Sequence, residues 1–219
     1  MSTVESRPAT VIARSKQPLV MVGCGILHKE VAYLIEQNGW EVETQFLDSA
    51  LHNYLNKLSE RLHGALVANA EQGRETVVFY GCCHPRMEAI LKHHHTVRTR
   101  GQNCIVMLLG YERFMAALEQ GAYFLLEDWA LTWEPMITQC FGHNLSVVRE
   151  IFHSSHKSMI AIRTPCSGDF TAAARAAAAF VDLPLTWMDV ELSHLESVLA
   201  GAIFLKQNPA DRCRERDSD

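Results

Sequence analysis

Short apolar runs alternate along this chain with longer stretches of helical periodicity, and this alternation constrains the fold more than any other feature. Apolar or alternating runs predict strands over 19–23, 41–47, 76–80, 105–109, 158–163 and 185–190. Helical spacing or propensity predicts helices over 28–38, 51–72, 85–91, 112–120, 135–140, 145–153, 170–181 and 194–199. Such alternation implies right-handed crossovers. We therefore expect an α/β fold with a mainly parallel, Rossmann-like sheet and helices on both faces.

The 219 residues are enough to bury a core in one large domain or two small ones. We expect a disordered lead-in over 1–17, a single α/β domain over 18–208, with two similar halves as the alternative division, and a charged tail over 209–219. The net charge of -5 counts against a nucleic-acid partner, which usually meets a basic face. Neither a secretion signal nor an apolar run of roughly 18 residues is present, so we expect a cytoplasmic location and no membrane partner.

Cysteines follow two of the predicted strands directly. Cys24 stands between Gly23 and Gly25 after the first strand, and Cys82 and Cys83 follow the third. The carboxyl ends of parallel strands share one edge of a sheet, and ligands bind at that edge. The sequence therefore predicts a thiol-rich pocket there. The cysteine count of seven is odd and no export signal is seen, so we expect reduced thiols rather than a disulfide framework.

The Gly23-Cys24-Gly25 turn favours a bound cofactor. Its two glycines allow a close approach of the backbone to a ligand, and the N-terminus of the next helix would lower the pKa of the thiol. The third glycine of a dinucleotide fingerprint is missing. The alternative is a buried cysteine beside a turn.

The Cys82-Cys83-His84 run offers two soft thiolates and an imidazole, which suit zinc, copper or an iron–sulfur cluster. The spacing is not that of a C-x-x-C motif. The alternative is a pair of small core residues at a strand end. Cys166 follows the strand predicted over 158–163 and is placed to reach the same edge.

Two further residues are undecided from local pattern. Cys104 precedes the strand predicted over 105–109, which would place it at the opposite edge of the sheet. His52 stands near the start of a long helix, evenly balanced between a structural role near the helix cap and a site role.

The tract His93-His94-His95 has a conspicuous composition, but consecutive residues face different sides of a helix and cannot all bind one metal ion. A polar helix end is favoured. Arg98, just beyond, is placed either to receive an anion or to be solvated. Trp129 either lines a pocket or packs in the core, and the core interpretation is favoured.

Several short motifs resemble those of a prokaryotic domain-of-unknown-function family. They are Cys24-Gly25-Ile26, Leu51-His52, Tyr80-Gly81-x-Cys83, Asn103-Cys104-Ile105 with Leu108-Leu109-Gly110, the segment 123–129 and the segment 196–201. The family typically reads A-C-G-I, L-H, Y-G-x-C-G and D-C-I-x-x-L-L-G at the first four places. The likeness extends over residues 19–208. His84 stands where the family has glycine, and Asn103 where it has aspartate, which puts any role of that aspartate in doubt.

The resemblance implies a context in one-carbon metabolism, because genes of this family often lie beside corrinoid-dependent methyltransferase systems. It implies that the residues to carry over are Cys24, His52, Cys83 and Cys104. A corrinoid protein or a methyltransferase is then the expected partner.

The leading hypothesis is a metal ion (zinc) or an iron–sulfur cluster held by cysteines, in a protein acting in corrinoid-linked methyl transfer or metal-cofactor handling. The expected metal ligands are Cys24, Cys82, Cys83, Cys104 and His52, and the expected cofactor contacts are Gly23, Gly25, Arg98 and Trp129. One alternative is a metal-free thiol enzyme that uses Cys24 or Cys83. The other is a non-catalytic accessory protein of a methyltransferase.

Overall fold

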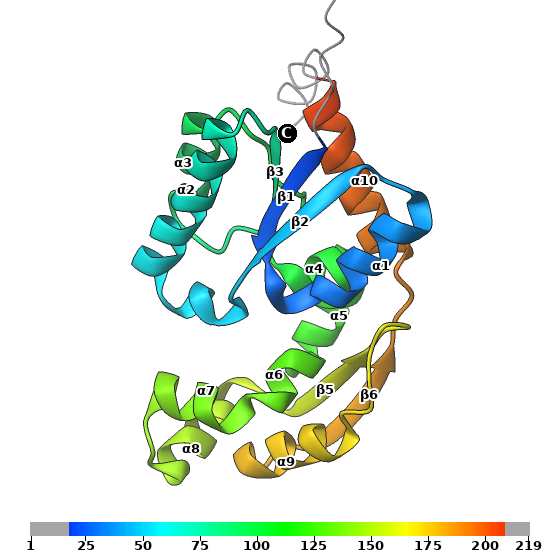
Figure 1. Ribbon diagram of the computed structural model, residues 1–219. Helices are drawn as coiled ribbons and strands as arrows, with labels where there is room; N and C mark the ends of the chain where they lie inside the picture. Colours follow the sequence, from blue (N-terminus) through cyan, green and yellow to red (C-terminus); the bar gives the residue numbers. More distant parts are fainter. Residues whose placement is uncertain (1–17, 209–219) are drawn as a thin grey trace, which may run out of the picture.

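The computed structural model describes residues 18–208, which form two three-stranded parallel sheets with helices packed against them (Figure 1). The first sheet has the order β2-β1-β3 and contains β1 (Leu19–Cys24), β2 (Val42–Leu47) and β3 (Thr76–Phe79). The second has the order β4-β5-β6 and contains β4 (Ala122–Leu125), β5 (Ser158–Arg163) and β6 (Leu185–Asp189). The parallel α/β architecture is confirmed, and its strands are divided between two sheets. The predicted lead-in and charged tail lie outside the described residues.

Side chains of the first sheet alternate between two helical layers, as the period of a strand requires. Val20, Val22 and Val78 pack against α2 (Leu55–Glu71) and α3 (Met87–His93). The intervening residues Leu19, Met21, Val77 and Phe79 pack with α1 (His28–Asn38) and α10 (Ser193–Gln207). Figure 1 shows α2 and α3 on one side of this sheet, and α1 and α10 on the other. Both faces are therefore covered, as expected for a parallel sheet.

The run predicted as a strand over 105–109 is a helix, α4 (Cys104–Leu109), which corrects the sequence prediction. The side-chain oxygen of Asn103 accepts a hydrogen bond from the Val106 amide at 2.9 Å, which is the usual helix N-cap. Gly110, with φ +80°, ends the helix. All residues of 105–109 are buried. A short apolar run that is buried on every side has no periodicity to separate strand from helix.

The other predicted elements differ from prediction mainly at their ends, whereas β4, α6 (Glu127–Leu131) and the 3₁₀ helix η1 (Gly25–Leu27) were not predicted. The helix predicted over 51–72 divides into a 3₁₀ helix, η2 (Ser49–Asn53), and α2. The last helix continues well beyond 199, to Gln207. The other elements are α5 (Tyr111–Glu119), α7 (Trp133–Phe141), α8 (Leu145–Ser155) and α9 (Thr171–Val181).

One hydrophobic core joins the two sheets. Leu125, Met159 and Ala161 pack against the outer helices of the second half, whereas Phe124 and Ile162 belong to the core of the first half. The green helices α4, α5 and α6 lead from one sheet to the other in Figure 1. Residues around the first sheet (the first half) can therefore meet residues around the second sheet (the second half) along one boundary, the seam. No helix within residues 18–208 is long and apolar enough to cross a membrane.

Candidate functional site

A cavity of about 280 Å³ lies beyond the carboxyl ends of β1 and β3. The predicted site residues that line it are Cys24, His52, Cys82, Cys83, Cys104 and Trp129. They come from the end of β1, from η2, from the loop after β3, from the start of α4 and from α6. The structure thus brings together side chains that are far apart in the sequence, at the place where parallel sheets bind ligands. The expected placement of Cys104 at the opposite edge is wrong, because Cys104 begins a helix.

Gly81 allows the loop after β3 to run directly against the segment that leads into α4. The Cys82 amide donates a hydrogen bond to the Gln102 carbonyl oxygen at 2.7 Å. A Cβ atom at position 81 would lie 2.5 Å from the Gln102 carbonyl carbon and 2.8 Å from the Asn103 Cα. Only glycine fits so close to another backbone. This contact carries Cys83 and Cys104 to the same cavity.

Burial favours the protonated form of three of the cavity thiols, those of Cys24, Cys83 and Cys104. The pKa of Cys24 is raised to about 12, chiefly by desolvation and to a smaller extent by the neighbouring Cys83 and acidic groups. Desolvation also raises the pKa values of Cys83 and Cys104. The lowered pKa expected for Cys24 is therefore wrong. The short helix η1 separates this thiol from α1, which begins only at His28, and burial outweighs what a helix terminus could contribute.

Backbone amides oppose this effect at each of the three sulfurs. The Ile26 amide lowers the pKa of Cys24, and the Gly81 amide lowers that of Cys83. The Ile105 amide does the same for Cys104. Each sulfur thus has an N–H group ready to stabilise it as a thiolate once a cation offsets the loss of water.

His52 is held in one tautomer at the edge of the cavity. Its Nδ1 lies 2.6 Å from the Ser49 carbonyl oxygen, and because a carbonyl only accepts, Nδ1 carries the proton. The Nε2 lone pair is then available, the arrangement usual for a metal-binding histidine. The Ser49 hydroxyl donates to the Asp128 carboxylate at 2.7 Å, which ties η2 to the helix that carries Trp129.

Two hydrogen-bond donors at the cavity are buried without a partner among residues 18–208. They are the Tyr80 hydroxyl and the Trp129 indole N–H. Burial raises the pKa of Tyr80, so its hydroxyl keeps its proton. An unsatisfied buried donor costs about 1–3 kcal/mol, which a ligand with acceptor atoms would recover. Sequence reasoning missed Tyr80, because the residue ends an apolar run and looks like part of a strand.

The predicted cofactor contacts Gly23 and Gly25 pack against neighbouring strands and do not line the cavity. A Cβ atom at Gly23 would lie 2.5 Å from the Phe79 Cβ. A Cβ atom at Gly25 would lie 3.1 Å from the Leu47 carbonyl oxygen. Gly23 therefore allows close packing of β1 on β3, and Gly25 allows the start of η1 to lie close to β2.

Arg98 stabilises the loop beside the cavity instead of lining it. Its Nε donates to the Glu88 carboxylate at 2.8 Å, and Nη1 donates to the carbonyl oxygens of Thr99 and Gly101. Its Nη2 lies 3.5 Å from the Cys82 sulfur. His84, also outside the cavity, accepts a hydrogen bond at Nδ1 from the Arg86 amide at 3.0 Å.

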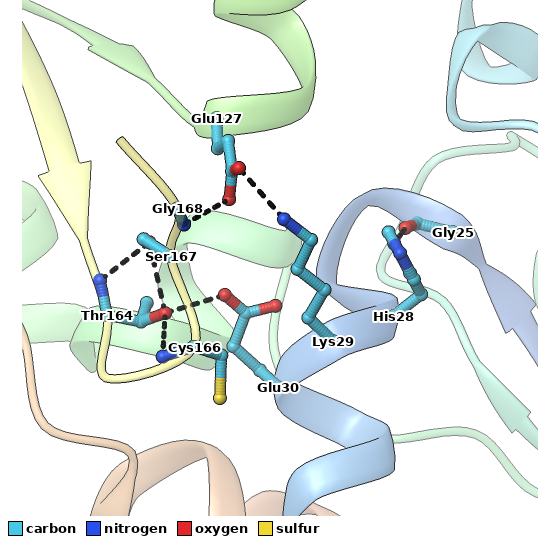
Figure 2. A network of polar contacts seen from close by, with 9 residues as sticks. All are labelled: Gly25, His28, Lys29, Glu30, Glu127, Thr164, Cys166, Ser167 and Gly168. Carbon is cyan, nitrogen blue, oxygen red and sulfur yellow. Dashed lines mark hydrogen bonds and ion pairs between the residues drawn. The ribbon is translucent and has the colours of Figure 1, made fainter. Parts of the chain in front are cut away.

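Cys166 lies away from the thiol cavity, beside a second cavity of about 250 Å³ on the seam between the halves. Figure 2 shows the polar contacts there. Lys29 forms an ion pair with Glu127 at 2.8 Å, and the Thr164 hydroxyl donates to the buried Glu30 carboxylate at 2.7 Å. These contacts connect α1 of the first half to the second half.

The histidine tract contributes to a cluster that sequence reasoning missed. One ring nitrogen from each of His63, His93 and His94 lies within 4.8 Å of the other two. Among residues 18–208, this is the one group of three or more His, Cys, Asp or Glu side chains whose ligand atoms are close enough to hold a metal ion. The cavity cysteines do not form such a set. Burial and the neighbouring histidines lower the pKa of His94. His63 stands on another helix, far away in sequence, so no local pattern pointed to it.

The chain belongs to a family described as a protein of unknown function (DUF1638), whose model matches residues 46–199. This confirms the resemblance to a domain-of-unknown-function family. The matched segment contains His52, Cys83 and Cys104 and begins after Cys24. No curated protein and no solved structure matches the chain.

Proposed function

We propose that this DUF1638 protein holds a thiolate-bound metal centre, a zinc ion or a small iron–sulfur cluster, with Cys24, Cys83 and Cys104 as its ligands. The observation that carries the proposal is the convergence on one cavity of three thiols from separate segments, together with the Nε2 lone pair of His52. Thiolate sulfur suits zinc and iron–sulfur clusters, and imidazole suits zinc. Cys82, which is exposed and also lines the cavity, is a further ligand within reach.

A cation supplies what the buried thiols lack. Metal binding displaces the thiol protons, and the backbone amides at each sulfur then stabilise the thiolates. A tetrahedral zinc ion with Zn–S bonds of 2.3 Å places its sulfur ligands about 3.8 Å apart. The ligands must therefore draw together on binding. Cys83 lies on the irregular loop between β3 and α3, so it is the ligand that moves with least loss of regular structure.

The unpartnered donors suggest a second ligand beside the metal. The Tyr80 hydroxyl and the Trp129 N–H would bind an acceptor atom of a small molecule held in the cavity. A metal ion keeps a bound thiol deprotonated, which is how a methyl-accepting thiol is activated. We therefore propose methyl transfer or metal-cofactor handling as the activity, with a corrinoid protein or methyltransferase as partner. The support for that partner is the family resemblance.

Metal analysis and absorption spectroscopy on untagged, anaerobically purified protein test the metal centre. An iron–sulfur cluster gives visible absorption, and a zinc site gives thiolate-to-cobalt charge-transfer absorption after exchange for Co²⁺. Substitution of Cys24, Cys83 or Cys104 by alanine should remove the metal. The matched control is Cys140→Ala, because Cys140 is exposed and outside the cavity. The proposal would be contradicted if the protein stays metal-free after reconstitution. It would also be contradicted if the cavity variants bind as much metal as Cys140→Ala.

The metal-free thiol enzyme requires a cysteine whose pKa lies below the ordinary value of about 8.5. Burial shifts the pKa of Cys24 and Cys83 in the opposite direction. The pH profile of alkylation, read for each cysteine by mass spectrometry, distinguishes the two. Fast alkylation of Cys24 near neutral pH would favour the metal-free enzyme. Co-purification with a methyltransferase, without metal or thiol reactivity, would favour the accessory protein.

A further inference from the structure

His63, His93 and His94 form a surface cluster on two neighbouring helices. His63 lies on α2, and His93 is the last residue of α3. The two helices pack against the same face of the first sheet through Leu62, which precedes His63, and Leu91, which lies two residues before His93. The packing of these apolar side chains therefore fixes the distance between the histidines.

The end of α3 explains why two consecutive histidines face the same way. His94 is the C-cap residue of α3, with φ -93° and ψ 7°, and is no longer helical. His95 has φ +51° and turns the chain away. Consecutive residues within a helix would diverge. Here the helix ends between them, and the rings of both His93 and His94 lie next to that of His63 on α2.

The geometry of the three rings suits a metal ion. The His94 Nε2 lies 2.8 Å from the His63 Nδ1, and ring centroids are 4.8 Å apart for His63 and His94 and 4.9 Å apart for His93 and His94. All three ligand atoms lie within 4.8 Å of one another. Tetrahedral zinc with Zn–N bonds near 2.05 Å places its nitrogen ligands about 3.3 Å apart. Small rotations of the exposed His63 and His93 side chains about the half-buried His94 reach that spacing from these separations.

We propose that His63, His93 and His94 bind a divalent transition-metal ion, Zn²⁺ by ligand preference, at a surface site separate from the thiol cavity. Neutral imidazole nitrogen is a good ligand for zinc and a poor one for calcium or magnesium. His63 and His93 are exposed, so solvent reaches the site and water can occupy a fourth position. The bound ion would cross-link α2 to α3, the helix that follows the Cys83 loop. The site shares no residue with the thiol cavity and does not depend on the proposed function.

Zinc binding by untagged, full-length protein tests this site, measured by equilibrium dialysis and metal analysis. The variants are His63→Ala and His94→Ala, and the matched control is His95→Ala, because His95 is adjacent in sequence but outside the set. We expect the parent and the control to bind about one more zinc ion per chain than His63→Ala, or to bind it at least roughly tenfold more tightly, since even outer partners of a metal ligand contribute 10-fold or more to affinity. Added zinc should raise the melting temperature of the parent and the control by more than that of His63→Ala, which keeps only the thiol cavity.

Co²⁺ spectra separate the two sites. Cobalt held by three imidazoles shows ligand-field absorption without thiolate charge transfer, so His63→Ala should leave any thiolate charge transfer unchanged. Equal zinc affinity in the parent and both variants would overturn the proposal. An equal loss in His95→Ala would overturn the assigned ligands. Loss of thiolate charge transfer in His63→Ala would overturn the separation from the thiol cavity.

Discussion

The contact between Gly81 and the segment before α4 predicts a large effect for Gly81→Ala. The added Cβ would lie 2.5 Å from the Gln102 carbonyl carbon and 2.8 Å from the Asn103 Cα, where ordinary contact begins at 3.4 Å. These are backbone atoms, so no side-chain rotation relieves the overlap. Overpacking of this kind costs about 1–3 kcal/mol. Moving the loops apart also breaks the hydrogen bond from the Cys82 amide, which contributes about 0.5–1.5 kcal/mol. We expect the free energy of unfolding to fall by about 2–4 kcal/mol.

Urea denaturation followed by tryptophan fluorescence measures this change, with Gly64→Ala as the matched control. Gly64 lies within α2, and a Cβ atom there meets nothing within 4 Å. The same chemical change should therefore stabilise the protein, by roughly 0.5–1 kcal/mol, because alanine favours helix. Domains of this size typically have 5–15 kcal/mol of stability, so Gly81→Ala should still fold.

Metal binding provides the second measurement on these two variants. Separation of the loops in Gly81→Ala should move Cys83 away from Cys104 and weaken any metal bound between them, whereas Gly64→Ala should bind metal like the parent. Equal urea midpoints for the two variants would refute the steric reasoning. A destabilised Gly81→Ala with unchanged metal affinity would refute the assignment of this loop contact to the site.

Three further predictions concern the thiols, the α4 cap and the seam. Because the pKa of Cys24 rises from 9.0 to about 12 on folding, the folded, metal-free protein keeps between pH 9 and 12 a proton that the unfolded chain loses. The stabilisation that this proton provides is complete below pH 9 and is lost as the pH rises from 9 to 12, by up to about 1.4 kcal/mol per pH unit. Urea midpoints should therefore fall less steeply with pH in Cys24→Ala than in the parent, and parallel profiles would contradict the assigned pKa shift. Asn103→Ala should lower the free energy of unfolding by about 1 kcal/mol, measured by thermal or urea unfolding, whereas Asn103→Asp, which keeps the capping oxygen, should change it by under about 0.5 kcal/mol. An aspartate variant as unstable as the alanine variant would rule out the capping role. Thr164→Val removes the hydrogen bond to the buried Glu30 and should cost about 1.5–3 kcal/mol, against under about 0.5 kcal/mol for the half-buried control Thr138→Val, whose hydroxyl makes an exposed hydrogen bond. A double-mutant cycle with Glu30→Gln should show coupling if the two side chains act as a pair.

The strand-end rule predicted the part of the site that depends on local sequence. The apolar runs before Cys24 and before Cys82 are strands of one sheet, and parallel strands present their carboxyl ends at one edge. Cys24, Cys82 and Cys83 therefore line the same cavity. The rule needs only periodicity and the position of each cysteine after its strand.

The helical state of α4 was not predictable from periodicity, because a run buried on every side has no polar face. Asn103 three residues before Val106 is a cap signal, but a cap signal alone does not outweigh an apolar run with strand composition. The presence of a helix where a strand was predicted also explains the division into two sheets. Without a strand at 105–109, β3 is an edge strand, and the short apolar stretch near 123 begins a second sheet as β4.

Residues from both halves of the chain line the cavity, so the contact between Trp129 and His52 could not be derived from local motifs, although Trp129 is an expected cofactor contact. Trp129 comes from the second half and meets the ring of His52, with centroids 6.0 Å apart. The hydrogen bond from Ser49 to Asp128 and the contacts of Glu30 and Lys29 across the seam are all pairs of distant residues. Since these pairs set the distance between the halves, loosening the seam should open the thiol cavity without altering any cysteine. Thr164→Val should therefore speed the alkylation of Cys24 relative to Cys140, and an unchanged ratio would mean that the first half alone shapes the cavity.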